Sequence, residues 1–216
     1  MTACALTSLG ILVNNADVAG TLEFVRTGTD SGQMLATGLW TRRETVIVAG
    51  MAAVPAQAHI DLSSIPHAMH ERCMRLAITK GRENPSFPFG VLIVRATDLT
   101  VMASGVNTTR RNPTFHGEID AINDYVRRHG NEGWERMILY TTGEPCTMCT
   151  SAIVWAGIGA VVFGSSIETL ARVGIRQIDI SSASVTHAAP FYHGSLLGGI
   201  LTSETDRLFA DRAPLS

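Results

Sequence analysis

Hydrophobic and polar residues follow one another in short segments whose repeat changes between helical and extended along most of the chain. Met69, Cys73, Leu76 and Ala77 recur at helical spacing, which predicts a helix from about Ser63-Ser64 to Lys80. The same criteria predict further helices at residues 116–129, 145–155, 167–173 and 203–211. Short apolar runs predict strands at residues 89–95, 100–106, 137–142, 160–164 and 177–180. This alternation predicts a layered α/β domain with helices packed on a sheet.

The first 58 residues lack this regular alternation. Residues 1–33 are rich in Gly, Thr, Asn and Asp and show no sustained hydrophobic repeat. Residues 34–58 follow a different pattern, and neither segment resembles what comes after it. We therefore expect an N-terminal extension over residues 1–58 and one domain over residues 59–216.

Within the extension, residues 34–58 have the order of parts found in a secretory signal peptide. Arg42-Arg43 is followed by a short apolar stretch and then by Ala56-Gln57-Ala58, which indicates a signal of the twin-arginine type. The apolar stretch is too short to span a membrane, and a buried core helix or strand is its alternative interpretation. If the signal is real, the mature protein begins at His59 and is exported to the periplasm; otherwise it is cytoplasmic.

The charge balance argues against a protein that binds nucleic acid. The chain has 17 basic and 19 acidic side chains, and 14 of the basic and 15 of the acidic ones lie at or after His59. A protein that neutralises many phosphates carries a basic surplus. The pairs Arg110-Arg111 and Arg127-Arg128 are therefore interpreted as solvated surface, and we expect a small molecule as the partner.

Two motifs carry the candidate chemistry. They are His116-Gly117-Glu118 and Pro145-Cys146-Thr147-Met148-Cys149, and this H-x-E followed by P-C-x-x-C resembles the signature of zinc deaminases. Four cysteines in a chain of 216 residues do not suggest a disulfide framework. Zinc prefers nitrogen and sulfur ligands, and a catalytic site keeps one position open for water. His116, Cys146 and Cys149 are therefore the candidate Zn²⁺ ligands.

The spacing within each motif suits a site at the start of two helices. Cysteines at positions i and i+3 share one face of a helical turn, and Pro145 at the first helical position would place both in the first turn. There the unpaired N–H groups and the helix dipole favour thiolates. His116 and Glu118, two residues apart, can face one site only around a helix start. Both motifs thus direct a helix N-terminus at the metal.

Glu118 is then a carboxylate beside the metal that does not bind it. It can take a proton from a metal-bound water, pass it to a ring nitrogen and later protonate the leaving amine. The alternative is a closed structural zinc site, which needs a fourth protein ligand. Cys73, His70 and His129 are the candidates for that fourth ligand.

At these residues the chain resembles the cytidine deaminase-like superfamily, over roughly residues 67–164. Residues 87–91 resemble the family's Pro-Phe-Gly-Ala stretch, and Asn107 is similar to an asparagine that contacts the base. Residues 116–119 are similar to the motif of small cytosine deaminases. Residues 139–149 resemble the guanine deaminase and tRNA adenosine deaminase branch. Residues 151–156 look most like guanine deaminases, whose tryptophan, here Trp155, lies near the base.

The resemblance implies a three-layer α-β-α fold with a central mixed sheet flanked by helices, and a homodimer. It implies hydrolytic, zinc-dependent deamination of a nucleobase or nucleoside with release of ammonia, a guanine-like purine being favoured. The substrate contacts it implies are Asn107, backbone groups near Val91 and Glu144, and stacking on Trp155. For Trp155 the alternative is an ordinary core aromatic.

Two other functions stay open. One is a tRNA adenosine deaminase, although Asp206 and Asp211 depart from the basic C-terminal helix of those enzymes. The other is a zinc-stabilised binding module without catalysis. Guanine itself is not assigned as the substrate, because residues 174–177 lack the acidic residue that guanine deaminases carry in this region, and their C-terminal tyrosine has no match near Phe209.

Overall fold

The computed structural model describes residues 59–214, so the expected segments 1–33 and 34–58 lie outside the described residues. The helices are α1 (His67–Gly81), α2 (Gly117–His129), α3 (Thr147–Ala156), α4 (Ile167–Arg172), α5 (Ser182–His187) and α6 (Thr202–Ala210), with short turns η1 (Leu62–Ser64) and η2 (Trp134–Arg136). The strands are β1 (Gly90–Arg95), β2 (Val101–Val106), β3 (Met137–Gly143), β4 (Ala160–Ser165) and β5 (Ser195–Leu197). No helix among these residues is long and apolar enough to cross a membrane.

The strands form one five-stranded mixed sheet in the order β2-β1-β3-β4-β5. β1 lies antiparallel to both β2 and β3, whereas β3, β4 and β5 run parallel. Parallel neighbours need a crossover connection, and α3 provides it between β3 and β4. The expected central mixed sheet is confirmed.

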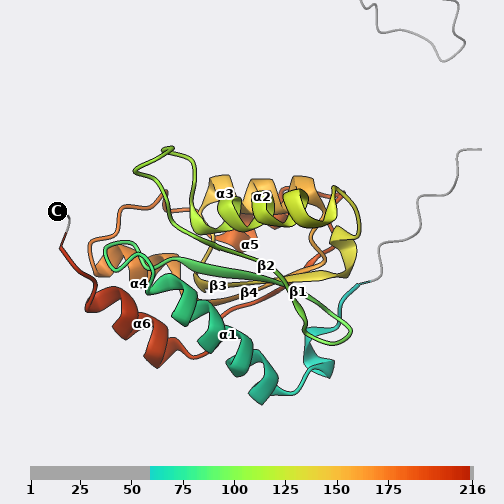
Figure 1. Cartoon of the computed structure of the whole chain (residues 1–216), viewed down its shortest axis with the longest axis horizontal. Helices are drawn as coiled ribbons and strands as arrows, with labels where there is room; N and C mark the ends of the chain where they lie inside the picture. Colours follow the sequence, from blue (N-terminus) through green and yellow to red (C-terminus); the bar gives the residue numbers. More distant parts are fainter. Residues whose placement is uncertain (1–58, 215–216) are drawn as a thin grey trace, which may run out of the picture. The chain divides into compact units, whose positions relative to one another are not determined.

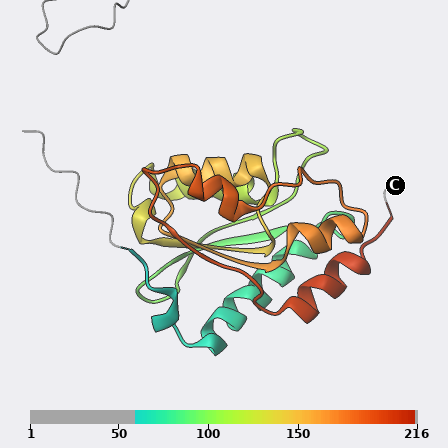
Figure 2. The same ribbon diagram turned by 180° about the vertical axis from the view of Figure 1, so that it is seen from behind.

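Each face of the sheet has its own hydrophobic core because alternate strand residues point to opposite faces. On one face, α2 and α3 lie side by side and bury Ile93, Leu139 and Ile153. On the other face, α1 packs Met74 and Ala77 against the sheet, with α6 beside it. The view from behind shows the same three layers (Figure 2). The expected α-β-α arrangement is therefore confirmed (Figure 1).

The structure corrects the prediction at residues 177–180 and at the start of α1. The predicted strand at 177–180 is wrong: Ile178 and Ile180 are exposed on a loop, and the last strand is β5. Alternating polar and apolar residues can predict a strand, but they do not specify which strand would pair with it. Residues 177–180 pair with none of the strands that the structure describes. Ser63-Ser64 also does not start α1, because these residues form η1 under an Asp61 cap, and α1 begins after Pro66.

Candidate active site

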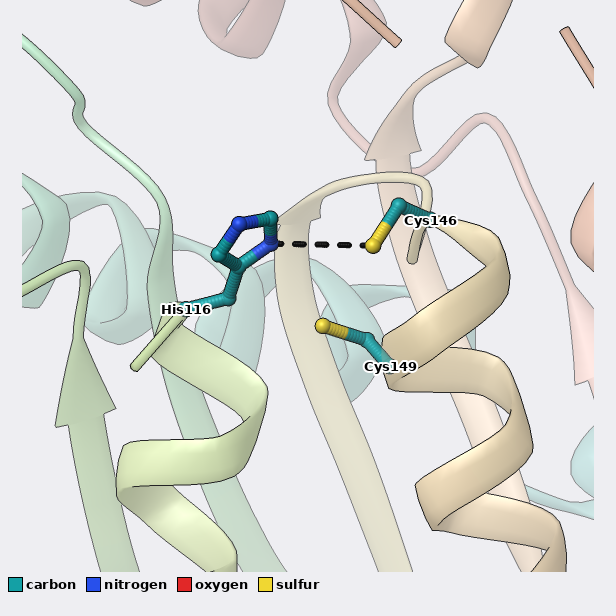
Figure 3. A group of neighbouring side chains, drawn as sticks. All are labelled: His116, Cys146 and Cys149. Carbon is teal, nitrogen blue, oxygen red and sulfur yellow. Dashed lines mark hydrogen bonds between the residues drawn. The ribbon is translucent and has the colours of Figure 1, made fainter. Parts of the chain in front are cut away.

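Two helix N-termini place three metal-binding side chains together (Figure 3). His116 is the N-cap of α2, and Cys146 is the N-cap of α3 with Cys149 in the first turn after it. The ligand atoms of the three residues all lie within 4.8 Å of one another, and His116 Nδ1 is 3.6 Å from Cys146 Sγ. Pro145 stands just before the N-cap rather than at the first helical position. Both cysteines still reach one point.

The donor set fits zinc with an open position. One imidazole and two thiols are nitrogen and sulfur ligands of the kind that zinc prefers, and three protein ligands are typical of a catalytic site. The candidates for a fourth ligand are engaged elsewhere: His70 bonds to Tyr140 and Leu62, and His129 contacts the carbonyl of Met102. Cys73 lies on α1 in the core of the opposite face. The closed-site alternative therefore lacks its fourth ligand among residues 59–214.

The pKa values of the two cysteine thiols shift in opposite directions. A hydrogen bond from Cys149 lowers the pKa of Cys146 to about 4, and His116 adds to this effect. The same hydrogen bond, together with burial, raises the pKa of Cys149. The bond to Cys146 also raises the pKa of His116. Cys146 therefore carries a thiolate, the form that binds metals, at neutral pH.

Glu118 lies beside this group, in the first turn of α2, and is 2% exposed. Burial raises the pKa of its carboxyl group, and the nearby Cys146 charge acts in the same direction. The sequence places Gly117 before it because α2 approaches β1 closely: a Cβ at Gly117 would lie 2.5 Å from the Phe89 carbonyl oxygen. A buried carboxyl group with a raised pKa is suited to hold a proton and give it up near neutral pH.

Sequence reasoning missed one contact of this carboxylate. Thr141 of β3 places its hydroxyl oxygen 3.2 Å from Glu118 Oε1. A threonine within an apolar strand is an ordinary β-sheet residue, so its sequence position carries no signal of this contact. The contact becomes visible only when β3 and α2 are placed side by side.

The four expected substrate contacts have different surroundings. Asn107 is buried and lines a cavity of about 460 Å³ formed by residues 83–87 and 106–111; its Oδ1 accepts hydrogen bonds from Thr109. The Val91 side chain lies fully inside the core, and its backbone is paired with Gly105 and Thr141 in the sheet, so a substrate role is left to backbone groups near it. Trp155 is 79% exposed and contacts Phe191, so the alternative of a core aromatic is wrong.

The carboxylate of Glu144 is used within the protein. It accepts hydrogen bonds from the backbone N–H of Ile167 at 3.0 Å and from the N–H and hydroxyl of Ser182 at 2.8 Å each. Its own N–H donates to the carbonyl of Ser165. The side chain thus fixes the segment that leads into Cys146, and only its backbone carbonyl is available to a ligand.

Comparison with known proteins gives consistent similarities. Residues 66–165 match the model of the cytidine and deoxycytidylate deaminase zinc-binding region. The guanine deaminase of Bacillus subtilis (strain 168) is 31% identical over 153 residues, covering 66% of this chain and 97% of the relative. A tRNA-specific adenosine deaminase of Haemophilus influenzae is 30% identical over 141 residues, covering 63% of this chain and 82% of the relative.

Solved structures resemble the fold as well. A tRNA:A34 deaminase superposes with a TM-score of 0.54 at 27% identity, covering 63% of this chain and 98% of the other. A guanine deaminase from Nitrosomonas europaea gives a TM-score of 0.56 at 17% identity, covering 67% of this chain and 82% of the other. The second likeness concerns the fold alone. Relatives with different substrates thus share one architecture with this chain.

Proposed function

This chain belongs to the zinc-dependent deaminases with the cytidine and deoxycytidylate deaminase zinc-binding region, which are hydrolases of C–N bonds, and on this premise we propose that its substrate is a free nucleobase or a nucleoside, a guanine-like purine being favoured. The observation that carries the proposal is the meeting of His116, Cys146 and Cys149 beside the buried carboxyl group of Glu118. The similarity to a guanine deaminase over nearly its whole length supports the preference for a purine.

We assign the roles as follows. His116, Cys146 and Cys149 would hold the zinc, which would supply a water nucleophile at neutral pH. Glu118 accepts a proton from the attacking water, gives one to a ring nitrogen and later gives one to the leaving amine. The balance is one amino-substituted ring and one water in, and one oxo-substituted ring and one ammonia out. Glu118 moves protons only and remains unchanged.

The cavity beside Asn107 is proposed to receive the base. Its volume of about 460 Å³ suits a small ligand, and Asn107 presents a buried amide at its wall. Backbone groups near Val91 and Glu144 are proposed to orient the ring. Stacking on Trp155 stays a prediction from the resemblance, because Trp155 lies in the last turn of α3 and Cys146 is the N-cap of the same helix. Replacing Asn107 by Ala would leave a base edge unpaired and lower kcat/KM for small substrates.

The test is ammonia release by zinc-loaded protein over a panel of adenine, guanine, cytosine, their nucleosides and an adenosine-bearing tRNA anticodon stem. We expect turnover of a free base or nucleoside far above that of the RNA. The Glu118→Gln variant should keep its zinc and lose about 10²–10⁴-fold in activity. Activity close to the unchanged protein in this variant would contradict the assigned role of Glu118.

The second candidate is a tRNA adenosine deaminase, and the 30% identity to such an enzyme favours it. The same panel separates the two candidates, since a preference for the anticodon stem would establish the second. A zinc module without catalysis would release no ammonia from any substrate. Homodimer formation is part of our proposal, and sedimentation of the purified protein tests it. N-terminal sequencing of the native protein tests whether it is exported and begins at His59.

A further inference from the structure

We propose that Thr141 is a positioning residue for Glu118, whose hydroxyl holds the carboxylate in the orientation that proton transfer requires. The inference rests on the proposed function, because it assumes that Glu118 moves the protons. It concerns a residue of the central sheet that belongs neither to the zinc ligands nor to the wall of the cavity beside Asn107.

The contact is fully buried. Thr141 is 0% exposed, and its Oγ1 lies 3.2 Å from Glu118 Oε1 and 3.0 Å from the carbonyl oxygen of Gly143. A hydroxyl group has one proton to donate and therefore serves one of these two acceptors at a time. A carboxylate is the stronger acceptor because its hydrogen bonds are charge-assisted. The hydroxyl of Thr141 can therefore donate to Glu118 without a change in the position of either side chain.

Packing alone does not require a hydroxyl at this position. Thr141 lies on the face of β3 that carries Leu139, whose side chain is buried in an apolar cluster. Valine would fill nearly the same volume without the cost of burying a polar group. The hydroxyl of the next residue, Thr142, is explained by its bonds to Pro88 and Gly90. The Thr141 hydroxyl has a backbone acceptor as well, the carbonyl of Gly143, and the side chain within its reach is Glu118.

The side chain of Thr141 is more rigid than that of Glu118, and a rigid donor can hold a flexible carboxylate in one orientation. Glu118 has three rotatable side-chain bonds, so its carboxylate needs an external restraint to keep one orientation. Thr141 is β-branched and lies within a strand paired on both sides, which holds its hydroxyl in place. The Cys149 thiol also lies beside the Glu118 carboxylate, and in the proposed function its sulfur would bind the zinc. Thr141 thus supplies a fixed donor from a rigid strand.

The experiment compares Thr141→Val and Thr141→Ser with the unchanged protein. Without the hydroxyl, kcat for the best small substrate should fall by about tenfold to hundredfold, the usual effect of losing a hydrogen bond to a charged group. KM should stay within about twofold, because Thr141 does not line the cavity. Zinc content should be unchanged. Thr141→Ser retains the hydroxyl and should recover most of kcat.

The matched control is Thr205→Val. Thr205 is also a threonine at 0% exposure with a bonded hydroxyl, but it lies on α6, and its partners are Ser165 and the backbone of its own helix. This variant should lose some thermal stability and keep kcat. If Thr141→Val does not fold, Thr141→Ala takes its place in the comparison with Thr141→Ser.

A double-variant cycle separates positioning from a structural effect. In a Glu118→Gln background, Thr141→Val should reduce kcat no further, because the group it positions is already gone. The inference is overturned if Thr141→Val keeps its kcat, if it loses zinc, or if it reduces kcat equally in both backgrounds. Full activity in Glu118→Gln alone would instead overturn the proposed function.

Discussion

At the scale of single residues, Cys149 inside the candidate metal site can be compared with Cys73 outside it. Cys149 is fully buried next to Cys146 and His116, whereas Cys73 is equally buried on α1 at the opposite face of the sheet. Zinc binding at this site needs all three protein ligands, and removal of one thiolate leaves only two of them. We predict that Cys149→Ala loses most of its zinc and that Cys73→Ala retains about one Zn²⁺ per chain.

Elemental analysis of the two purified variants measures this directly. Circular dichroism of both shows whether the fold is kept, so that loss of metal can be told from loss of structure. Full zinc occupancy in Cys149→Ala would remove this residue from the ligand set. Loss of zinc from Cys73→Ala would show that the metal lies elsewhere.

The same scale shows how far sequence reasoning reaches. His116, Cys146, Cys149 and Glu118 are predicted to meet because the two motifs together resemble the zinc deaminase signature and each suits a helix start, and the structure brings them together. The contact of Thr141 with Glu118 is not predicted, because Thr141 belongs to neither motif. Local spacing describes one turn, and it does not describe which elements become neighbours.

At the scale of elements, Glu144 connects three segments. Its carboxylate accepts hydrogen bonds at the first residue of α4 and the first residue of α5, and it directly precedes the Pro145-Cys146 turn. These N–H groups have no partner within their own helices. We predict that Glu144→Ala lowers the free energy of unfolding by about 2–4 kcal/mol, because it leaves buried donors without an acceptor.

Glu144→Gln keeps one acceptor oxygen and should fall between the unchanged protein and Glu144→Ala. Urea unfolding at equilibrium gives the three values. The control is Glu168→Ala, since Glu168 is 81% exposed in a surface ion pair with Arg172 and should contribute little. Equal stability of Glu144→Ala and Glu168→Ala would contradict the connecting role.

β5 and α5 are missing from the elements that the sequence predicts. β5 has three residues, and the six residues of α5 bury only Ser182, whereas the equally short α4, which is predicted, buries Ile167 and Leu170. The start of α5 does carry a signal, because the Ser181 side chain accepts a hydrogen bond from the Ser184 N–H as an N-cap. The pairing of β5 with β4 depends on a connection that runs through α4 and α5, and no local pattern specifies it.

At the scale of the whole molecule, the charge balance predicts how activity responds to salt. Acidic and basic side chains are nearly equal in number from His59 onward, and a base or nucleoside carries no phosphate. Between about 50 mM and about 200 mM salt, kcat/KM for the small substrate should change by less than about twofold, whereas binding through many phosphate contacts weakens by orders of magnitude. Initial rates over a salt series test this, and a steep decline would indicate a polyanionic substrate.

The layered architecture was predictable, and the strand order was not. Alternating strands and helices indicate helices on both faces of a sheet, as observed for α1 and α2. The central position of β3 between an antiparallel and a parallel neighbour follows from packing of the complete chain. The hydrophobic pattern of a strand predicts which of its faces is buried, but it does not predict which strand pairs with it.

The segment that precedes α1 determines how far the chain can be shortened from its N-terminal side. The Leu62 carbonyl accepts the Nε2 proton of the buried His70, so that Nδ1 accepts from the Tyr140 hydroxyl, and the Ile60 carbonyl accepts from Ser195. A chain that begins at Pro66 should therefore melt at a lower temperature, and be digested faster by protease, than one that begins at His59. Cleavage after Ala58, where the sequence predicts it, would leave these anchoring bonds intact.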